Sequence, residues 1–197
     1  MLTGQPAHSP SDLTILRESR VRPERFAELF DAYHSEIYRY VASRLSAGHA
    51  DDLAAETFLV AFRGRARFEG TGGQVRAWLY GIATNLIRRH RRDEERKYRA
   101  LGRAAQPDPN HVDDDQILAR VAAQGVQLEL AAALRALKPA DRDVLLLVAL
   151  GELNYAQVAL ALDIPEGTVA SRLNRARKAV RTALGGVNPI RDETGTS

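Results

Sequence analysis

The feature that most constrains the fold of this chain is an apolar repeat of three and four residues, which occurs in two separate blocks. In the first block it falls on Phe26, Leu29, Phe30, Tyr33, Ile37, Tyr40, Val41 and Leu45. This spacing places apolar side chains on one face of an amphipathic helix, and no segment shows a convincing strand pattern. With 197 residues, the chain is long enough for two small domains. We therefore predict an all-α fold of two small helical domains.

The first block predicts three helices, over about residues 26–45, 50–65 and 75–98. The second helix is expected to bury Ala54, Phe58, Ala61 and Phe62, and the third to bury Leu79, Ile82, Ala83 and Leu86. The glycine-rich residues 69–73 interrupt the helices. We expect residues 23–103 to form the first domain. Residues 1–22 have no apolar period and are predicted to be a disordered tail.

The second block begins after a segment that contains Pro107, Pro109 and three consecutive aspartates, Asp113 to Asp115. This composition predicts a flexible acidic linker over residues 104–127. The helical period returns over residues 128–185, which we expect to form the second domain. Within it, Asn154 and Gln157 have the spacing of a capping box that starts a helix over residues 155–162. Residues 186–197 are polar and are predicted to be a disordered tail.

Composition excludes several classes of protein. The sequence has no cysteine, so disulfides and thiolate metal sites are excluded. The longest apolar run, residues 144–150, is too short to span a bilayer, and the first residues lack the pattern of a signal peptide. A cytoplasmic protein is expected. Three of the 28 basic residues are lysine, so 25 are arginine, which suits phosphate or guanine contacts but is also what a GC-rich genome produces.

The last two predicted helices, residues 155–162 and 166–184, have the pattern of a helix-turn-helix. Residues 166–181 contain five basic residues and one acidic residue, a net charge of +4. On the face opposite the apolar positions, we expect Thr168, Ser171, Asn174 and Arg175 to reach base edges, and Arg172, Arg177 and Lys178 to hold phosphates. The alternative is an ordinary solvated basic face. The helix pair, the turn and the charge together favour DNA binding.

The third predicted helix carries a second cationic segment. Residues 75–103 contain nine basic and three acidic residues, a net charge of +6. Gly81, Asn85, Arg88 and Arg92 are expected to line the polar face of the helix. Trp78 and Tyr80 near its start suit the stacking of unpaired bases, although an aromatic residue in a helix is more often part of the core.

The second predicted helix is acidic on its outer face. Asp52, Glu56, Leu59 and Arg63 are expected to point outward there, and an exposed leucine among charges is typical of a surface that binds a protein. A metal site built on Asp51, Asp52 and Glu56 lacks a second ligand cluster. The five histidines are scattered along the sequence without ligand spacing. No phosphate-binding loop or catalytic motif is present, so we expect neither a cofactor nor enzymatic activity.

Four segments in this order resemble the extracytoplasmic-function (ECF) sigma factors of bacterial RNA polymerase. They are FAELFDAYHSEIYRYV, DDLAAETFLVAFR, RAWLYGIATNLIRRHRR, and the run LRALKPADRDVLLLVALGELNYAQVALALDIPEGTVASRLNRARKAVR. The resemblance covers residues 26–103 (sigma region 2) and 128–184 (sigma region 4). The acidic DDLAAETF and the WLYGIATN segments distinguish it from regulators that share only a helix-turn-helix.

The resemblance implies a promoter-specificity subunit of RNA polymerase. It implies that Asp52, Glu56, Leu59 and Arg63 bind core RNA polymerase. It further implies that Trp78, Tyr80, Asn85, Arg88 and Arg92 recognise and open the minus-10 element, with the minus-35 element read by the helix from Glu166. An anti-sigma factor is an expected partner. The alternatives are a stand-alone helix-turn-helix regulator of duplex DNA and, with less support, a helical nucleic-acid enzyme.

Overall fold

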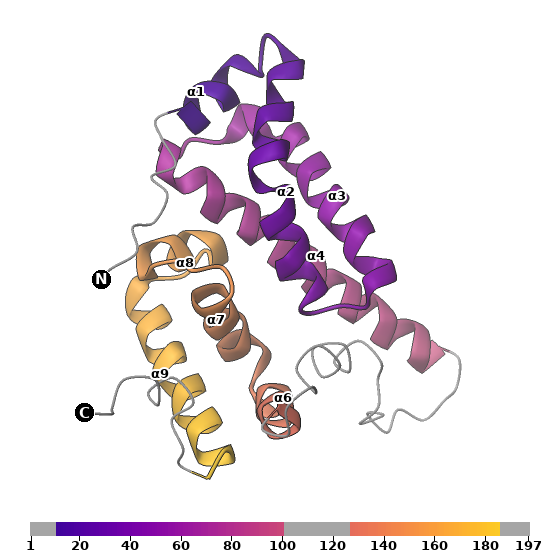
Figure 1. The fold of residues 1–197 in the computed structure, drawn as a ribbon, viewed down its shortest axis with the longest axis vertical. Coiled ribbons are helices and arrows are strands. Elements are labelled where there is room, and N and C mark those ends of the chain that lie inside the picture. Colours follow the sequence, from indigo (N-terminus) through magenta and orange to yellow (C-terminus); the bar gives the residue numbers. More distant parts are fainter. Residues whose placement is uncertain (1–10, 101–126, 186–197) are drawn as a thin grey trace, which may run out of the picture.

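The computed structural model of the chain describes residues 11–100 and 127–185, and every regular element in these ranges is helical (Figure 1). The predicted linker, apart from Gln127, and the predicted C-terminal tail lie outside the described residues. The α-helices are α1 (Ser11–Glu18), α2 (Ala27–Ala42), α3 (Ala47–Gly64), α4 (Val75–Ala100), α6 (Gln127–Ala136), α7 (Pro139–Ala149), α8 (Tyr155–Leu162) and α9 (Glu166–Ala183). Short 3-10 turns occur at Pro23–Phe26, Arg65–Arg67 and Gly72–Gln74.

Helices α2, α3 and α4 form the first domain, as the apolar repeat predicts. Leu29, Tyr33 and Ile37 on α2 are almost fully buried, and they share one apolar core with Phe58 on α3 and Leu79 on α4. Three helices that each bury one stripe of apolar residues form a closed core of this kind. The boundaries of α2, α3 and α4 lie within three residues of the predicted ones.

Helix α1 shows that the predicted N-terminal tail is wrong for residues 11–22. Leu16 is fully buried in the core of the first domain. The hydroxyl of Tyr33 donates a hydrogen bond to the carboxylate of Asp12, and both residues are buried. Burial and this carboxylate raise the pKa of Tyr33. An eight-residue helix that buries one leucine has too few apolar positions to produce a readable period, which is why the sequence pattern missed it.

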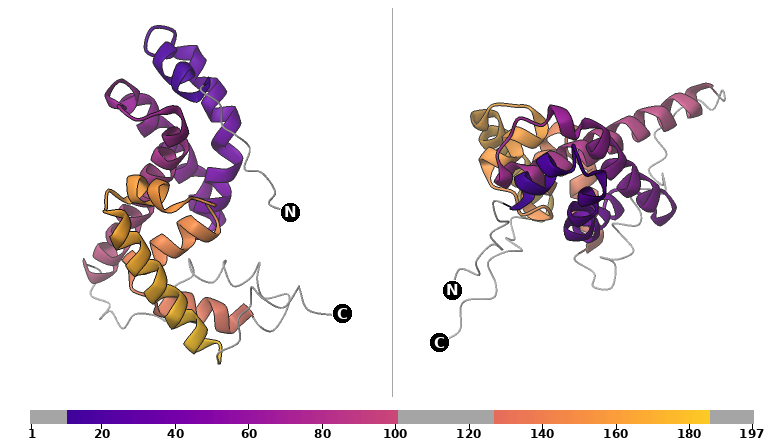
Figure 2. Two further views of the ribbon diagram at one scale, coloured as in Figure 1. Left: turned by 90° about the vertical axis from the view of Figure 1, so that its left-hand side faces the viewer. Right: turned by 90° about the horizontal axis from the view of Figure 1, so that it is seen from above.

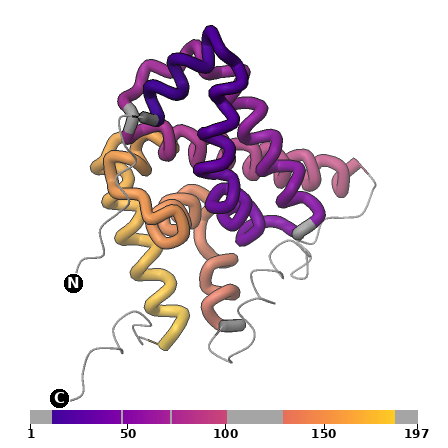
Figure 3. The backbone as a smooth tube through the Cα atoms, turned by 45° about the horizontal axis from the view of Figure 1, so that its top comes forward, coloured from indigo at the N-terminus to yellow at the C-terminus, as the bar shows by residue number. Residues whose placement is uncertain are grey.

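Helices α6 to α9 form the second domain. The capping box at the start of α8 is confirmed, because the backbone N–H of Gln157 donates to the side chain of Asn154 and the backbone N–H of Asn154 donates to the side chain of Gln157. Asp163 ends α8 in the left-handed region, with a φ of 52°. Aspartate tolerates this conformation better than most residues. The turn that follows directs α9 away from α8 (Figure 3).

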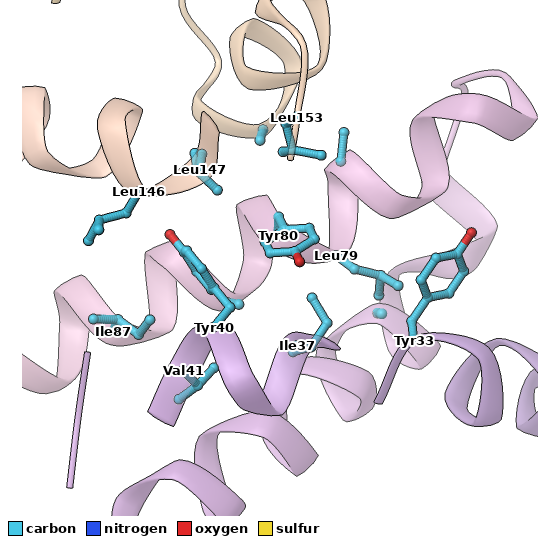
Figure 4. Packing of buried hydrophobic residues seen from close by; sticks show 14 of the residues in the cluster. Tyr33, Ile37, Tyr40, Val41, Leu79, Tyr80, Ile87, Leu146, Leu147 and Leu153 are labelled. Atoms are coloured by element: carbon cyan, nitrogen blue, oxygen red, sulfur yellow. The ribbon is translucent and has the colours of Figure 1, made fainter. Parts of the chain in front are cut away.

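The two domains pack against each other through α4, which lies along α8 (Figures 1 and 2). Leu146, Leu147 and Leu153 of the second domain belong to the same buried cluster as Tyr40 and Tyr80 of the first (Figure 4). The sequence predicted two domains joined by a flexible linker and gave no sign of this shared core. None of the described helices is both long and apolar enough to cross a membrane.

The shared core changes which residues of α4 are buried. Leu79 and Ala83 are buried as predicted, whereas Ile82 and Leu86 are only half-buried. Tyr80 and Ile87 are buried instead. Helix α4 contacts α2 and α3 on one side and α8 on the other, so its apolar residues occupy more than one stripe.

We expect Leu16→Ala to lower the free energy of unfolding by about 2–5 kcal/mol, because it removes a fully buried side chain and leaves a cavity. Val21→Ala is the matched control, since Val21 is 86% exposed and should change the free energy of unfolding little. Urea unfolding followed by circular dichroism measures both. Equal stabilities for the two variants would show that α1 is not part of the folded domain.

Candidate nucleic-acid interface

Helix α9 separates an apolar face from a polar, cationic face. Val169, Leu173 and Ala176 are buried against the second domain. The opposite face exposes five of the seven predicted DNA-contacting residues, while Thr168 and Arg172 are half-buried; the exposed five are Ser171, Asn174, Arg175, Arg177 and Lys178. The structure therefore brings all seven predicted residues onto one accessible helix. A helix of this kind fits the major groove of DNA.

Arg175 is held in place by Asp141 of α7. Two guanidinium nitrogens of Arg175 lie 3.0 and 3.2 Å from the two carboxylate oxygens of Asp141, a bidentate pair. The hydrogen bond to Asp141 raises the pKa of Arg175. Asp141 itself is buried, so this pair fixes the arginine at the middle of α9. The sequence identified Arg175 but gave no sign of its partner.

The two aromatic residues near the start of α4 have different environments. Trp78 is half-buried, and its ring centroid lies 4.9 Å from that of Phe68 in the loop before α4. Tyr80 is 1% exposed and packs edge-on against Tyr40, with 5.0 Å between ring centroids. Burial raises the pKa of Tyr80. Of the two alternatives that the sequence left open, the core position holds for Tyr80 in this structure, while Trp78 is half-buried and packs against the edge of the hydrophobic core.

The predicted cationic face of α4 is only partly accessible. Asn85 and Arg92 are exposed, and the C-terminal turns of α4 extend beyond the other helices (Figure 2). Gly81, which the sequence placed on the same open face, is instead buried. A Cβ atom added to Gly81 would lie 2.5 Å from the carbonyl oxygen of Ala161 on α8. Only glycine permits the two helix backbones to approach this closely.

A buried ionic cluster joins the two domains beside this contact. Asp143 of α7 is 1% exposed, and its carboxylate pairs with Arg44, in the turn just after α2, and with Arg88 of α4. The Arg88 Nε lies 2.7 Å from a carboxylate oxygen of Asp143. Arg44, which is 2% exposed, also donates to the hydroxyl of Tyr40 at 2.7 Å.

The charge of Arg44 is preserved in this buried site. Burial alone would lower the pKa of Arg44, but Tyr40 and Asp143 outweigh that effect and the pKa is raised. The Tyr40 hydroxyl lies 2.8 Å from the Thr84 hydroxyl, which in turn donates to the backbone carbonyl of Tyr80. Sequence reasoning missed Arg44 and Asp143 because they are 99 residues apart and neither belongs to a local motif.

The outer face of α3 is fully open. Asp52, Glu56, Leu59 and Arg63 are all exposed, as the sequence predicts, and Leu59 has 45% of its surface accessible. Val60 beside it is also exposed. Carboxylates that flank exposed apolar side chains form a mixed surface suited to a protein partner.

The histidines are less scattered than the sequence indicates. His49 on α3 lies near His90 on α4, with 4.6 Å between ring centroids, and Glu94 is the i+4 neighbour of His90. One potential ligand atom from each of the three lies within 4.8 Å of the others. The helical spacing of His90 and Glu94 and the contact between the His49 and His90 rings are sufficient to explain why these three side chains lie together. Asp51, Asp52 and Glu56 do not form such a group within the described ranges 11–100 and 127–185.

Comparison with known proteins matches both domains to sigma-factor families. Residues 29–97 match the family model for sigma-70 region 2, and residues 127–180 match the model for sigma-70 region 4. The chain is 34% identical over 151 residues to the ECF RNA polymerase sigma factor SigC of Mycobacterium tuberculosis, covering 76% of this chain and 77% of SigC. It is 30% identical over 168 residues to SigW of Bacillus subtilis, covering 82% of this chain and 89% of SigW.

Two solved structures have a similar fold. The sigma factor RpoE of Bartonella quintana, solved with the anti-sigma factor NepR, gives a TM-score of 0.62 at 21% identity, over 83% of this chain and 98% of RpoE. CnrH, solved with the cytosolic domain of CnrY, gives a TM-score of 0.63 at 20% identity, over 90% of this chain and 99% of CnrH. With regions 2 and 4 in order and these relatives over most of its length, the chain belongs to the ECF RNA polymerase sigma factors, alternative sigma factors that act in transcription initiation.

Proposed function

We propose that this sigma factor binds core RNA polymerase through the outer face of α3, reads duplex minus-35 DNA with α9 and opens the minus-10 element with α4. The observation that carries the proposal is that these helices present three separate faces of two kinds: a mixed acidic and apolar face on α3, and cationic faces on α4 and α9. The protein acts in the cytoplasm, takes no cofactor and has no catalytic activity of its own, because catalysis belongs to the polymerase.

The α3 face is proposed as the polymerase-binding surface. Leu59 at the centre of the face supplies an apolar anchor, and Asp52 and Glu56 lie on the same side of the helix because they are four residues apart. Exposed carboxylates contribute specificity and a faster association rate more than affinity. The partner surface should therefore be basic, with an apolar pocket for Leu59.

Helix α9 is proposed as the minus-35 reader. Ser171 and Asn174 project from its exposed face toward the positions of base edges, and Asn is suited to bidentate contact with adenine. Arg172, Arg177 and Lys178 flank them as phosphate contacts, which set position and register rather than sequence. Arg175, fixed by Asp141, contributes a guanidinium in a preset orientation.

Helix α4 and the loop before it are proposed as the minus-10 reader. Trp78 packs on Phe68, and together these rings provide a surface on which an unpaired base stacks. Asn85 and Arg92 are exposed farther along the helix, where a strand leaving the stacking site would pass. In the structure Tyr80 and Arg88 are covered or paired by the second domain, so their proposed contacts require that domain to move.

An anti-sigma factor is a further proposed partner. RpoE of Bartonella quintana, which shares the fold, was solved with the anti-sigma factor NepR. The support for a similar partner here is the exposed apolar surface at Leu59 and Val60 of α3 and at Leu160 of α8, which remains open in the free chain.

Run-off transcription with purified core RNA polymerase tests the proposed function. On a fragment library that includes DNA upstream of the gene, we expect discrete transcripts only when this protein is present. Asp52→Arg combined with Glu56→Arg should abolish them by reversing the charge of the polymerase-binding face. Asp31→Arg, an exposed aspartate on α2, is the matched control and should retain activity. Specific duplex binding without any transcripts would favour a stand-alone regulator instead.

The proposed division of labour on α9 predicts two different mutant phenotypes. Lys178→Ala should weaken binding to all minus-35 duplexes alike and reduce the slope of log affinity against log salt by about 0.9, because one phosphate contact is lost. Asn174→Ala should leave the salt slope unchanged and relax the preference at one base position. Fluorescence anisotropy over a salt series, with duplexes substituted at single positions, measures both effects. Identical phenotypes for the two variants would contradict the assignment.

A further inference from the structure

Two histidines and a glutamate from helices α3 and α4 meet at one place on the first domain. His49 lies in the first turn of α3, and His90 and Glu94 lie one turn apart on α4. The ring centroids of the two histidines are 4.6 Å apart, and Nε2 of His90 lies 3.4 Å from a carboxylate oxygen of Glu94. The three side chains therefore direct two imidazoles and one carboxylate toward a common point.

These groups form a ligand set that favours a transition-metal ion. Imidazole nitrogen and carboxylate oxygen together suit Zn²⁺ and its neighbours Co²⁺ and Ni²⁺, whereas Mg²⁺ and Ca²⁺ prefer ligand sets made only of oxygen. In a tetrahedral zinc site with bonds of about 2.0 Å, the ligand atoms lie about 3.3 Å from one another. The separation between His90 and Glu94 already has this value.

The third ligand needs only a small adjustment. The ligand atoms of the group all lie within 4.8 Å of one another, so the widest separation has to shorten by at most about 1.5 Å to reach zinc geometry. His49 is exposed, and rotation of its side chain can supply this change without moving the backbone.

A serine hydroxyl orients the ring of His49. Ser46 occupies the N-cap position of α3, but its side chain makes no capping hydrogen bond. Its Oγ lies instead 2.7 Å from Nδ1 of His49. When Nδ1 donates its proton to this hydroxyl, Nε2 carries the lone pair that a metal ion requires. Histidines that bind metals are usually oriented by such a hydrogen bond on the other ring nitrogen.

The backbone beneath the three ligands is fixed by the core of the first domain. Ala50, next to His49, and Ile87, one turn before His90, are both fully buried in that core. The packing of α3 on α4 thus brings the ligands together by itself. Little further ordering is needed when an ion binds, which favours affinity.

We propose that His49, His90 and Glu94 bind a divalent transition-metal ion, with Zn²⁺ the best match, and that this ion joins the start of α3 to α4. Three protein ligands leave a fourth position for water. The ion braces the first domain and takes no part in chemistry. This site is independent of the proposed reading of promoter DNA.

Titration of the full chain without an affinity tag tests the site. In a calorimeter we expect saturable binding of one Zn²⁺ per chain at micromolar protein concentration, and no binding of Mg²⁺. Saturation with Zn²⁺ should raise the thermal midpoint of unfolding, because the ion binds the folded chain. Co²⁺ should occupy the same site, so Zn²⁺ should displace it and reverse the change in its visible absorption spectrum.

Variants of the ligands and of their support give different expected results. His49→Gln, at an exposed position, and Glu94→Gln should each abolish binding of Zn²⁺ and the rise in thermal midpoint. Ser46→Ala keeps all three ligands and should lower the affinity by about tenfold. His34→Gln, at a half-buried histidine of α2 outside the group, is the matched control and should bind like the wild type. Circular dichroism checks that each variant is folded.

Two results would overturn the site. The first is an absence of saturable Zn²⁺ binding by the folded wild-type protein. The second is an unchanged Zn²⁺ affinity in folded His49→Gln and Glu94→Gln, because the ion would then be held elsewhere on the chain. Neither result bears on the run-off assay, so failure of the metal site and failure of the proposed function are separate outcomes.

Discussion

The arrangement of the whole molecule depends on the carboxylate of Asp143. A charge that is 1% exposed is stable only when it is paired, and both of its partners, Arg44 and Arg88, belong to the other domain. In separated domains the same carboxylate would be hydrated by water and need no partner. The burial of Asp143 is therefore a property of the packed state: its carboxylate is excluded from water only while α4 and α8 remain in contact. Two cations facing one anion also leave the cluster with a net positive charge. This charge limits how strongly the cluster stabilises the packed arrangement of the two domains.

Around this cluster, the hydrophobic core runs from one domain into the other without a break. Tyr40 and Tyr80 contribute to the core of the first domain and also meet Leu147 of the second (Figure 4). Separation of the domains would expose this apolar surface as well as the charges, so the free-energy cost of separation would have to be offset by new contacts. A tyrosine such as Tyr80 is suited to both situations, because an aromatic ring can pack against leucine when buried and can stack on a base when exposed.

Local sequence features predicted most of the architecture and little of the contact between the domains. The apolar repeat located α2, α3 and α4, and the Asn154–Gln157 pair located the start of α8. These features depend on residues three or four apart. Helix α1 was missed because its burial depends on a single leucine, and Gly81 was placed on an open face because a helical wheel does not show what packs against it. The pairing of Arg44 with Asp143 arises only when distant segments fold together, and no short-range pattern carries it.

Charge is distributed unevenly among the faces that the packed structure leaves accessible. The net charge of the whole chain is only +3, yet residues 166–181 alone carry +4 and residues 75–103 carry +6, so the remainder is net acidic. Part of that acidic charge lies on α3, whose proposed interface is complete in the packed state. Of the two cationic faces, the one on α4 is partly covered by the second domain, whereas α9 exposes most of its polar face. A binding surface that is already exposed can bind its partner at first encounter. A surface covered by the other domain can bind only after the free-energy cost of uncovering it has been offset. Under the proposed assignment of roles, the faces on α3 and α9 are accessible in the packed arrangement, and full use of the α4 face requires the second domain to move.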